Sequence, residues 1–285
     1  MLWFIIALAG ALSDSVHALI NKRILKDLDH ISTATGVFLG TSLILLIVSL
    51  IKGIPELGDQ FIWSVFSTAF LNVIAVLIFF KALKNLDLSL AVPILSFTPI
   101  FMIFTSFFLL GELPSIMGIF GIMFVVIGVY VMNFKNYRNL LGPLTNIFTN
   151  KYMFYMLCVA FIYSFSASID KIVLLNSDPF FGSGSIFAVA GLTLLIIMKF
   201  TGKSAKCFVS KSHYFILTSF AAVLVAICIN YAYTMQMASY VISIKRTSIL
   251  FSVLFGCLVL REENTFKRLT GAIFMVIGVV LMLVF

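Results

Sequence analysis

Asp14, His17 and Asn21 interrupt an otherwise apolar segment near the start of the sequence. Their spacing of three and four residues places them on one face of a helix. A carboxylate and an imidazole on one face can bind a polar molecule or relay a proton near neutral pH. The alternative is a set of hydrogen bonds that fixes helix packing. A similar stripe recurs 149 positions later, as Tyr163, Ser166 and Asp170.

Two adjacent cations, Lys245 and Arg246, lie inside a later apolar segment. An ionisable side chain at membrane depth is costly and marks a candidate functional site. The pair either binds an anionic or carboxylate group of a substrate, or forms a buried ion pair that only holds helices together, with Asp170 as the best partner. Because adjacent side chains on a helix point about 100° apart, we expect only one of the two to face a site.

A looser set of polar residues completes the candidates. Two prolines in one apolar segment, Pro93 and Pro99, remove backbone hydrogen bonds beside Ser96 and Thr98. The segment then either bends during gating or carries a static kink. The remaining candidate site residues are Asn72, Asn230 and Tyr233.

The composition is typical of a membrane protein, because 62% of the 285 residues are hydrophobic and only 11% are charged. Soluble domains are about one quarter charged, so most of this surface faces lipid. The net charge of +8 does not indicate nucleic-acid binding, since the basic residues fall mainly between apolar segments. Metal-ligand and catalytic motifs are absent from the sequence, and we expect no cofactor, no metal and no enzymatic activity.

The sequence divides into ten apolar segments, each close to the roughly 20 residues that a helix needs to cross the bilayer. We therefore predict an all-α membrane protein with ten transmembrane helices. The segment between 135 and 151 contains Asn, Gly and Pro and is interpreted as a linker between residues 1–134 and 152–285. The ten segments lie near 1–20, 31–51, 61–83, 88–110, 114–134, 152–175, 179–198, 213–236, 239–260 and 266–285.

The two halves of the chain are related as a sequence repeat. At an offset of 150, Glu112 falls on Glu262, Gly121 on Gly271 and Gly128 on Gly278. Five helices make an odd number of crossings, so the second repeat enters the membrane from the opposite side. The prediction is two inverted five-helix repeats around a central cavity, the arrangement of many secondary transporters. Mirrored polar stripes should meet in that cavity.

The glycines and glutamates that recur in both halves have predicted structural roles. The glycines are seven residues apart on one helix face, which favours close helix packing. Each glutamate lies in a short turn, where we expect it to cap the helix that follows.

Loop charge predicts the orientation, because cytoplasmic loops carry an excess of Lys and Arg. Most of the 19 basic residues fall in the odd-numbered loops. These loops are therefore predicted to be cytoplasmic, with both termini outside.

Residues 82–132 and 238–283 share one pattern: a polar start, a long apolar helix, a Glu in a short turn, and a helix that contains Gly. In this the chain resembles the drug/metabolite transporter superfamily, and within it the ten-helix proteins with two EamA domains. The resemblance implies a basket of ten helices, with helices five and ten at the periphery. It also implies import or export of amino acids, nucleotide-type metabolites or drugs, often by exchange or proton coupling. Several similar proteins keep both termini in the cytoplasm, so the orientation rests on loop charge alone.

The leading hypothesis is a secondary active transporter, an exporter or exchanger of small metabolites such as amino acids or related amphipathic compounds. A flippase or transporter of lipid-linked or nucleotide-linked sugars is the alternative. The sequence lacks the motifs expected of an enzyme that acts on lipid-linked substrates. A channel is disfavoured, because inverted repeats favour alternating access. The expected partners are a small-molecule substrate, the lipid bilayer of a bacterial inner or plasma membrane, coupling protons and a second copy in a homodimer.

Overall fold

The computed structural model describes residues 1–25, 27–83, 85–86, 93–133, 147–203, 208, 211–252 and 265–284, without the side chains of Lys22, Asn133 and residues 265–269. Most of the predicted linker lies outside these residues, as do Glu262 and the end of the segment predicted at 239–260.

The described residues form ten helices and no strand, which confirms the predicted fold class. Seven helical segments are long and apolar enough to cross a membrane, and shorter apolar helices accompany them. The predicted segment 61–83 coincides with α3, and most other predicted limits fall within a few residues of the observed ones. The helices are α1 (Leu2–Ile24), α2 (His30–Lys52), α3 (Phe61–Leu83), α5 (Thr98–Leu110), α6 (Ile116–Asn133), α8 (Lys151–Leu175), α9 (Pro179–Phe200), α11 (Ser212–Met235), α12 (Ala238–Lys245) and α14 (Thr265–Val284).

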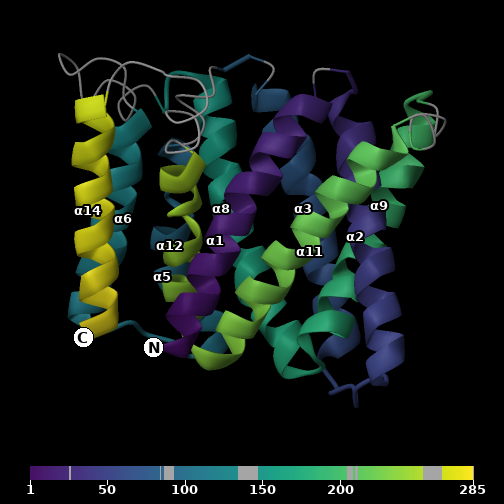
Figure 1. The fold of residues 1–285 in the computed structure, drawn as a ribbon, viewed down its shortest axis with the longest axis horizontal. Coiled ribbons are helices and arrows are strands. Elements are labelled where there is room, and N and C mark those ends of the chain that lie inside the picture. Colours follow the sequence, from purple (N-terminus) through teal and green to yellow (C-terminus); the bar gives the residue numbers. More distant parts are fainter. Residues whose placement is uncertain are drawn as a thin grey trace.

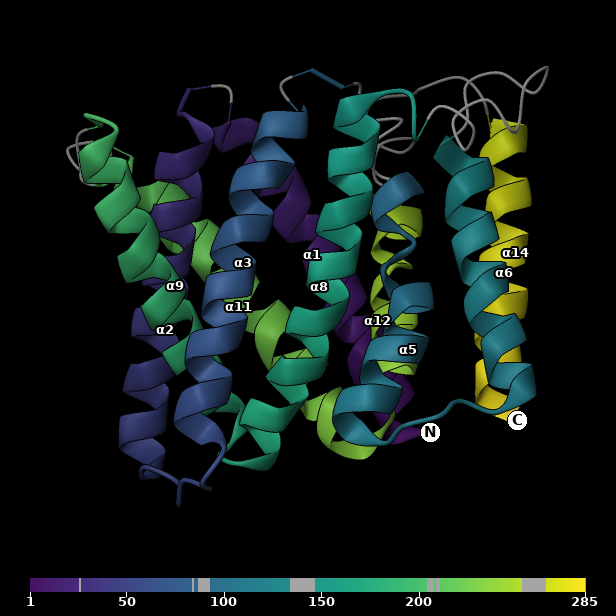
Figure 2. The same cartoon turned by 180° about the vertical axis from the view of Figure 1, so that it is seen from behind.

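The helices stand side by side and run between two ends of the molecule. Both termini lie at one end, whereas α8, the first helix of the second repeat, begins at the opposite end (Figures 1 and 2). The first helices of the two repeats therefore run in opposite directions, as an inverted repeat requires. The pair α6 and α14 stands at one side of the molecule, next to α5 and α12, and α2 and α9 stand at the other side.

Local sequence chemistry sets several helix ends. The side chains of Asp29, Asn150 and Asp178 accept backbone N–H bonds at the starts of α2, α8 and α9. Gly111 ends α5 at φ 68°, a left-handed conformation that glycine adopts without a steric penalty. Polar residues and glycine between the apolar segments therefore set where these helices begin and end.

The glycines predicted for close packing bring α6 against α14. A Cβ built on Gly121 would lie 2.7 Å from the carbonyl oxygen of Gly278, and one built on Gly128 would lie 2.6 Å from that of Gly271. Gly121 is the repeat equivalent of Gly271, and Gly128 that of Gly278, so the two contacts exchange under a two-fold rotation. The equivalent rings of Phe124 and Phe274 stack with centroids 5.9 Å apart. The pseudo-two-fold axis therefore passes between these two helices.

Gly271→Leu should separate α6 from α14, because its side chain would meet the carbonyl oxygen of Gly128. Overpacking of this kind costs about 1–3 kcal/mol. Thermal melting of the purified protein measures the effect. Val276→Leu is the control, because Val276 is exposed on the other side of α14. Equal melting temperatures for both variants and the wild type would contradict the close contact.

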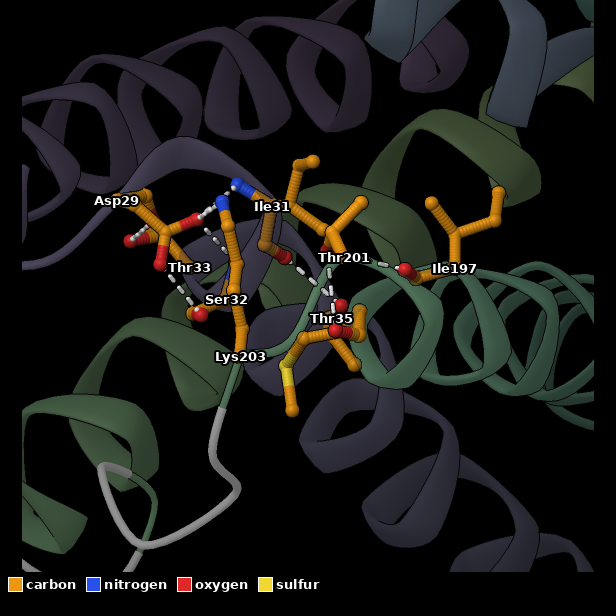
Figure 3. A network of polar contacts seen from close by, with 9 residues as sticks. Asp29, Ile31, Ser32, Thr33, Thr35, Ile197, Thr201 and Lys203 are labelled. Carbon is orange, nitrogen blue, oxygen red and sulfur yellow. Dashed lines mark hydrogen bonds and ion pairs between the residues drawn. The ribbon is translucent and has the colours of Figure 1, made fainter.

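The connections at one end of the bundle are tied together by Asp29 (Figure 3). Its carboxylate accepts the backbone N–H groups of Ile31 and Ser32 at 3.0 and 3.1 Å, and forms an ion pair with Lys203 after α9. Partial burial favours the neutral acid, but the bonds from Lys203 and Ser32 outweigh it and lower the pKa of Asp29 below its usual 3.8. The ionised form of this carboxyl therefore stabilises the folded state.

A group with a lowered pKa stabilises the fold above its unfolded pKa, and this contribution is lost as the pH falls through the folded value. Asp29→Asn keeps an effective N-cap and removes only the charge, so it should lower the melting temperature near pH 7 slightly and reduce the loss of stability below about pH 4. Asp29→Ala should cost about 1 kcal/mol more because the cap is lost. Melting curves between pH 3 and 7 test this; identical pH profiles for wild type and Asp29→Asn would refute the role of the charge.

Candidate functional site

A cavity of about 420 Å³ lies between the two repeats. Its size suits a small-molecule ligand, for which pockets of about 300–1,000 Å³ are usual. The lining side chains come from both repeats, as expected for a site near the pseudo-symmetry axis. Ten of the eleven predicted site residues line it: Asp14, His17, Asn72, Tyr163, Ser166, Asp170, Asn230, Tyr233, Lys245 and Arg246.

Asn21 is the predicted site residue that the structure places outside the cavity lining. Its side-chain nitrogen lies 3.0 Å from Nε2 of His17, and its oxygen accepts the hydroxyl of Thr218 at 2.9 Å. Asn21 therefore connects α1 to α11 and orients the imidazole that faces the cavity. The helical spacing was a correct guide to the shared face, but the cavity does not extend to this turn.

Two helices are interrupted at equivalent positions beside the cavity. The first helical turn at residues 93–95 is separated from α5 by a turn at Ser96 and Phe97, and α12 is separated from the helical residues after it by a turn at Arg246 and Thr247. These positions are 150 residues apart. Transporter binding sites are commonly built from discontinuous helices of this kind.

The prolines indicated the interruption in the first repeat, but the second has no proline at this point. The repeat offset was the signal that could have found it.

Arg246 reaches from the break after α12 to the start of α5. Its Nη2 donates to the hydroxyl of Thr98 at 2.8 Å. Its Nε is buried and has no hydrogen-bond partner among the described residues. Buried polar groups are nearly always paired, so an unpaired guanidinium donor in a cavity wall indicates a place for a ligand.

Both cations, Lys245 and Arg246, line the cavity, so the expectation that only one would face the site is wrong. The alternative interpretation, a buried ion pair with Asp170, is not observed among the described residues either. Within the described residues, neither Lys245 nor Arg246 has a carboxylate within 4 Å, although Lys245 acts on Asp170 electrostatically. The break after α12 directs Arg246 toward α5, and Asp170 faces α3 instead. There its Oδ1 accepts the hydroxyl of Thr68 at 2.5 Å.

Thr68 and Ser183 are polar residues of the site region that sequence reasoning missed. Thr68 joins Asp170 to Ser166, and Ser183 accepts a hydrogen bond from Asn230. Single hydroxyls inside apolar segments are common in membrane helices, because they can also bond to the preceding turn. Their partners depend on helix rotation, which the sequence pattern does not provide.

A second polar cluster joins four segments at the end of the bundle where the termini lie. Lys171 of α8 forms an ion pair with Glu112 and donates to the carbonyl oxygen of Gln236 at 2.6 Å. The other carboxylate oxygen of Glu112 accepts the backbone N–H of Ala238, the first residue of α12, at 2.8 Å. We call these four residues, Glu112, Lys171, Gln236 and Ala238, the end clamp.

The end clamp corrects the predicted role of Glu112, which does not cap the helix that follows it. Ser115 does so instead, by accepting the N–H of Gly118 at 3.0 Å. Glu112 caps α12 of the other repeat. The cap partner was missed because it lies 126 positions away in the chain.

Glu112→Gln should destabilise the protein strongly, because Lys171 would remain buried without its counter-charge. The side chains of Lys171 and Glu112 are only 10% and 15% exposed, and breaking a buried pair from one side costs about 3–5 kcal/mol. Adding Lys171→Met should recover part of the loss, as measured by thermal melting. Glu56→Gln, at an exposed position in another connection, is the control. A double variant as unstable as the sum of both single variants would contradict the pairing.

Comparison with known proteins places this architecture in a family. The sequence pattern of the EamA-like transporter family matches residues 1–134 and 150–284. A crystal structure of a protein matches with a TM-score of 0.75 at 15% identity, over 98% of this chain and 95% of that one, which supports the fold alone. No curated protein matches the sequence. Because the family match covers both halves, the chain belongs to the EamA-like transporter family and is an integral multi-pass membrane transporter of the drug/metabolite type.

Proposed function

We propose that the protein is a secondary active transporter that exports or exchanges small zwitterionic metabolites, such as amino acids and related amphipathic compounds, across an inner or plasma membrane. The observation that supports this most is a cavity of metabolite size with carboxylates and cations in the same wall. Charged groups at membrane depth need partners. A zwitterion supplies both signs in one small molecule.

Arg246 is suited to the carboxylate of such a substrate. Thr98 occupies one of its donors, while Nε is left without a partner among the described residues. Guanidinium groups bind carboxylates through two parallel N–H bonds. A substrate carboxylate would satisfy the unpaired donor.

Asp14 is suited to the substrate ammonium group. Its side chain lines the cavity, has no hydrogen bond within the described part of the chain, and acts electrostatically on Arg246 without forming an ion pair within 4 Å. The two groups thus line the same cavity without forming an ion pair. An α-amino acid, whose ammonium and carboxylate share one carbon atom, would bridge them.

The inverted repeats support alternating access, because two similar halves can exchange conformations around a central site. The broken helices α5 and α12 provide points where each repeat can bend. The end clamp joins the two repeats at one end of the bundle. It would have to open when that end admits or releases the substrate.

A thermal-shift screen of the purified protein tests the proposed substrate class. A ligand that binds the folded state raises stability by RT ln(1 + [L]/Kd). Free amino acids should raise the melting temperature, whereas their methyl esters, which lack the carboxylate, and their N-acetyl derivatives, which lack the ammonium, should not. Arg246→Gln and Asp14→Asn should each abolish the shift.

Lys199→Gln serves as the control, because Lys199 is exposed at the end of α9 and does not line the cavity. Stabilisation by methyl esters as strong as by free amino acids would rule out carboxylate recognition. Stabilisation by nucleotide-linked or lipid-linked sugars alone would favour the alternative function.

A further inference from the structure

We propose that Asp170 is the proton-binding residue of the transport cycle, so that its protonation and deprotonation couple substrate movement to a pH gradient. This inference rests on the proposed transport function and adds its driving ion. Asp170 lies within the membrane-spanning part of α8, at the cavity wall.

The two carboxylate oxygens of Asp170 have different surroundings. Oδ1 accepts the Thr68 hydroxyl at 2.5 Å, whereas Oδ2 has no hydrogen-bond partner among the described residues. No described cation lies within 4 Å of either oxygen. An ionised carboxylate with one hydrogen bond is poorly compensated at membrane depth, and binding a proton removes the charge.

The hydroxyl groups beside Asp170 can pair with it in both protonation states. Oγ1 of Thr68 lies 2.5 Å from Asp170, 2.9 Å from Oγ of Ser166 and 3.3 Å from the carbonyl oxygen of Ser166. When Asp170 is ionised, Thr68 donates to it and the Ser166 hydroxyl donates to Thr68. When a proton binds at Oδ1, the new O–H donates to Thr68, and Thr68 donates to the Ser166 carbonyl oxygen.

This exchange needs only the rotation of hydroxyl hydrogens, so no heavy atom has to move to accept or release the proton. Asn72 supports the arrangement by directing its amide at Thr68 Oγ1 across 3.4 Å. A carboxyl group that is paired in both states can change its protonation without a large conformational cost.

The charged neighbours of Asp170 keep the ionised state accessible. Lys245 of α12 acts on it electrostatically from beyond ion-pair distance. Glu112, which also interacts with Tyr233, is already paired with Lys171. Among the described residues that line the cavity, α3, α5 and α9 contribute no titratable group. The titratable and charged groups facing this region from the other elements are Asp14 and His17 of α1, Tyr163 of α8, Tyr233 of α11, Lys245 of α12 and Arg246 after it.

Asp14 is the matched carboxyl group for comparison. It lines the same cavity but lacks the hydroxyl partners of Asp170 and interacts with Arg246. We assign it to the substrate. Asp170→Asn should therefore remove proton binding, whereas Asp14→Asn should remove substrate binding.

The first experiment measures protonation without any substrate. Infrared difference spectra of the purified protein between acidic and alkaline pH should contain the carbonyl stretch of a protonated carboxyl that is absent in Asp170→Asn and present in Asp14→Asn. Thr68→Val, which keeps the carboxyl group but removes its hydroxyl partner in both protonation states, should retain this band and change its frequency. Identical difference spectra for wild type and Asp170→Asn would overturn the proposal.

The second experiment measures coupling in proteoliposomes that contain a mixture of amino acids. Wild type should accumulate amino acids under an imposed pH gradient and exchange them without one. Asp170→Asn should retain exchange but lose accumulation, whereas Asp14→Asn should lose both. Accumulation by Asp170→Asn at the wild-type level would contradict its role as the coupling residue. If wild type neither exchanges nor binds any amino acid, the proposed substrate class fails, while the infrared result still decides whether Asp170 binds a proton.

Discussion

Charge within the membrane is the constraint on which the rest of this structure depends. A charged side chain at the bilayer centre costs at least about 2.5 kcal/mol, so the bundle has to surround it with polar partners. Asp170 accepts the hydroxyl of Thr68, and Arg246 donates to the hydroxyl of Thr98; both threonines lie on helices of the other repeat. The helices that carry these groups must therefore meet at the centre. The apolar faces of the same helices are left for lipid, which accounts for the many exposed Phe, Leu and Ile side chains.

The repeats share a scaffold but not its charges. The two broken helices are interrupted at positions 150 residues apart. The pseudo-two-fold rotation also exchanges the two glycine contacts between α6 and α14. Arg246, however, occupies the position equivalent to Ser96. A symmetric frame can exchange its two conformations with little change in packing. Under the proposed function, the asymmetric charge would give the substrate a single orientation, while the symmetric frame would allow the movement.

The sequence was informative wherever periodicity and hydropathy set the structure. It predicted α3 at its observed limits, the shared face of Asp14 and His17, and the glycines between α6 and α14. Specific partners could not be predicted in this way. Asp170 bonds to Thr68 rather than to Lys245, and Glu112 caps a helix of the other repeat. Such contacts depend on how far each helix is rotated about its axis, which an apolar pattern does not define when nearly every face is apolar.

Asp170 and Lys171 connect the cavity to the end clamp through a single turn of α8. Adjacent helical side chains point about 100° apart, so Asp170 lines the cavity while Lys171 faces Glu112 and Gln236. Tyr233 extends this connection, because it lines the cavity on the helix that ends just before Gln236 and is buried between the two regions. A rotation of this turn therefore cannot alter one of the two clusters without altering the other. Under the proposed role of Asp170, this arrangement would link its protonation to the contact that joins the repeats at one end of the bundle.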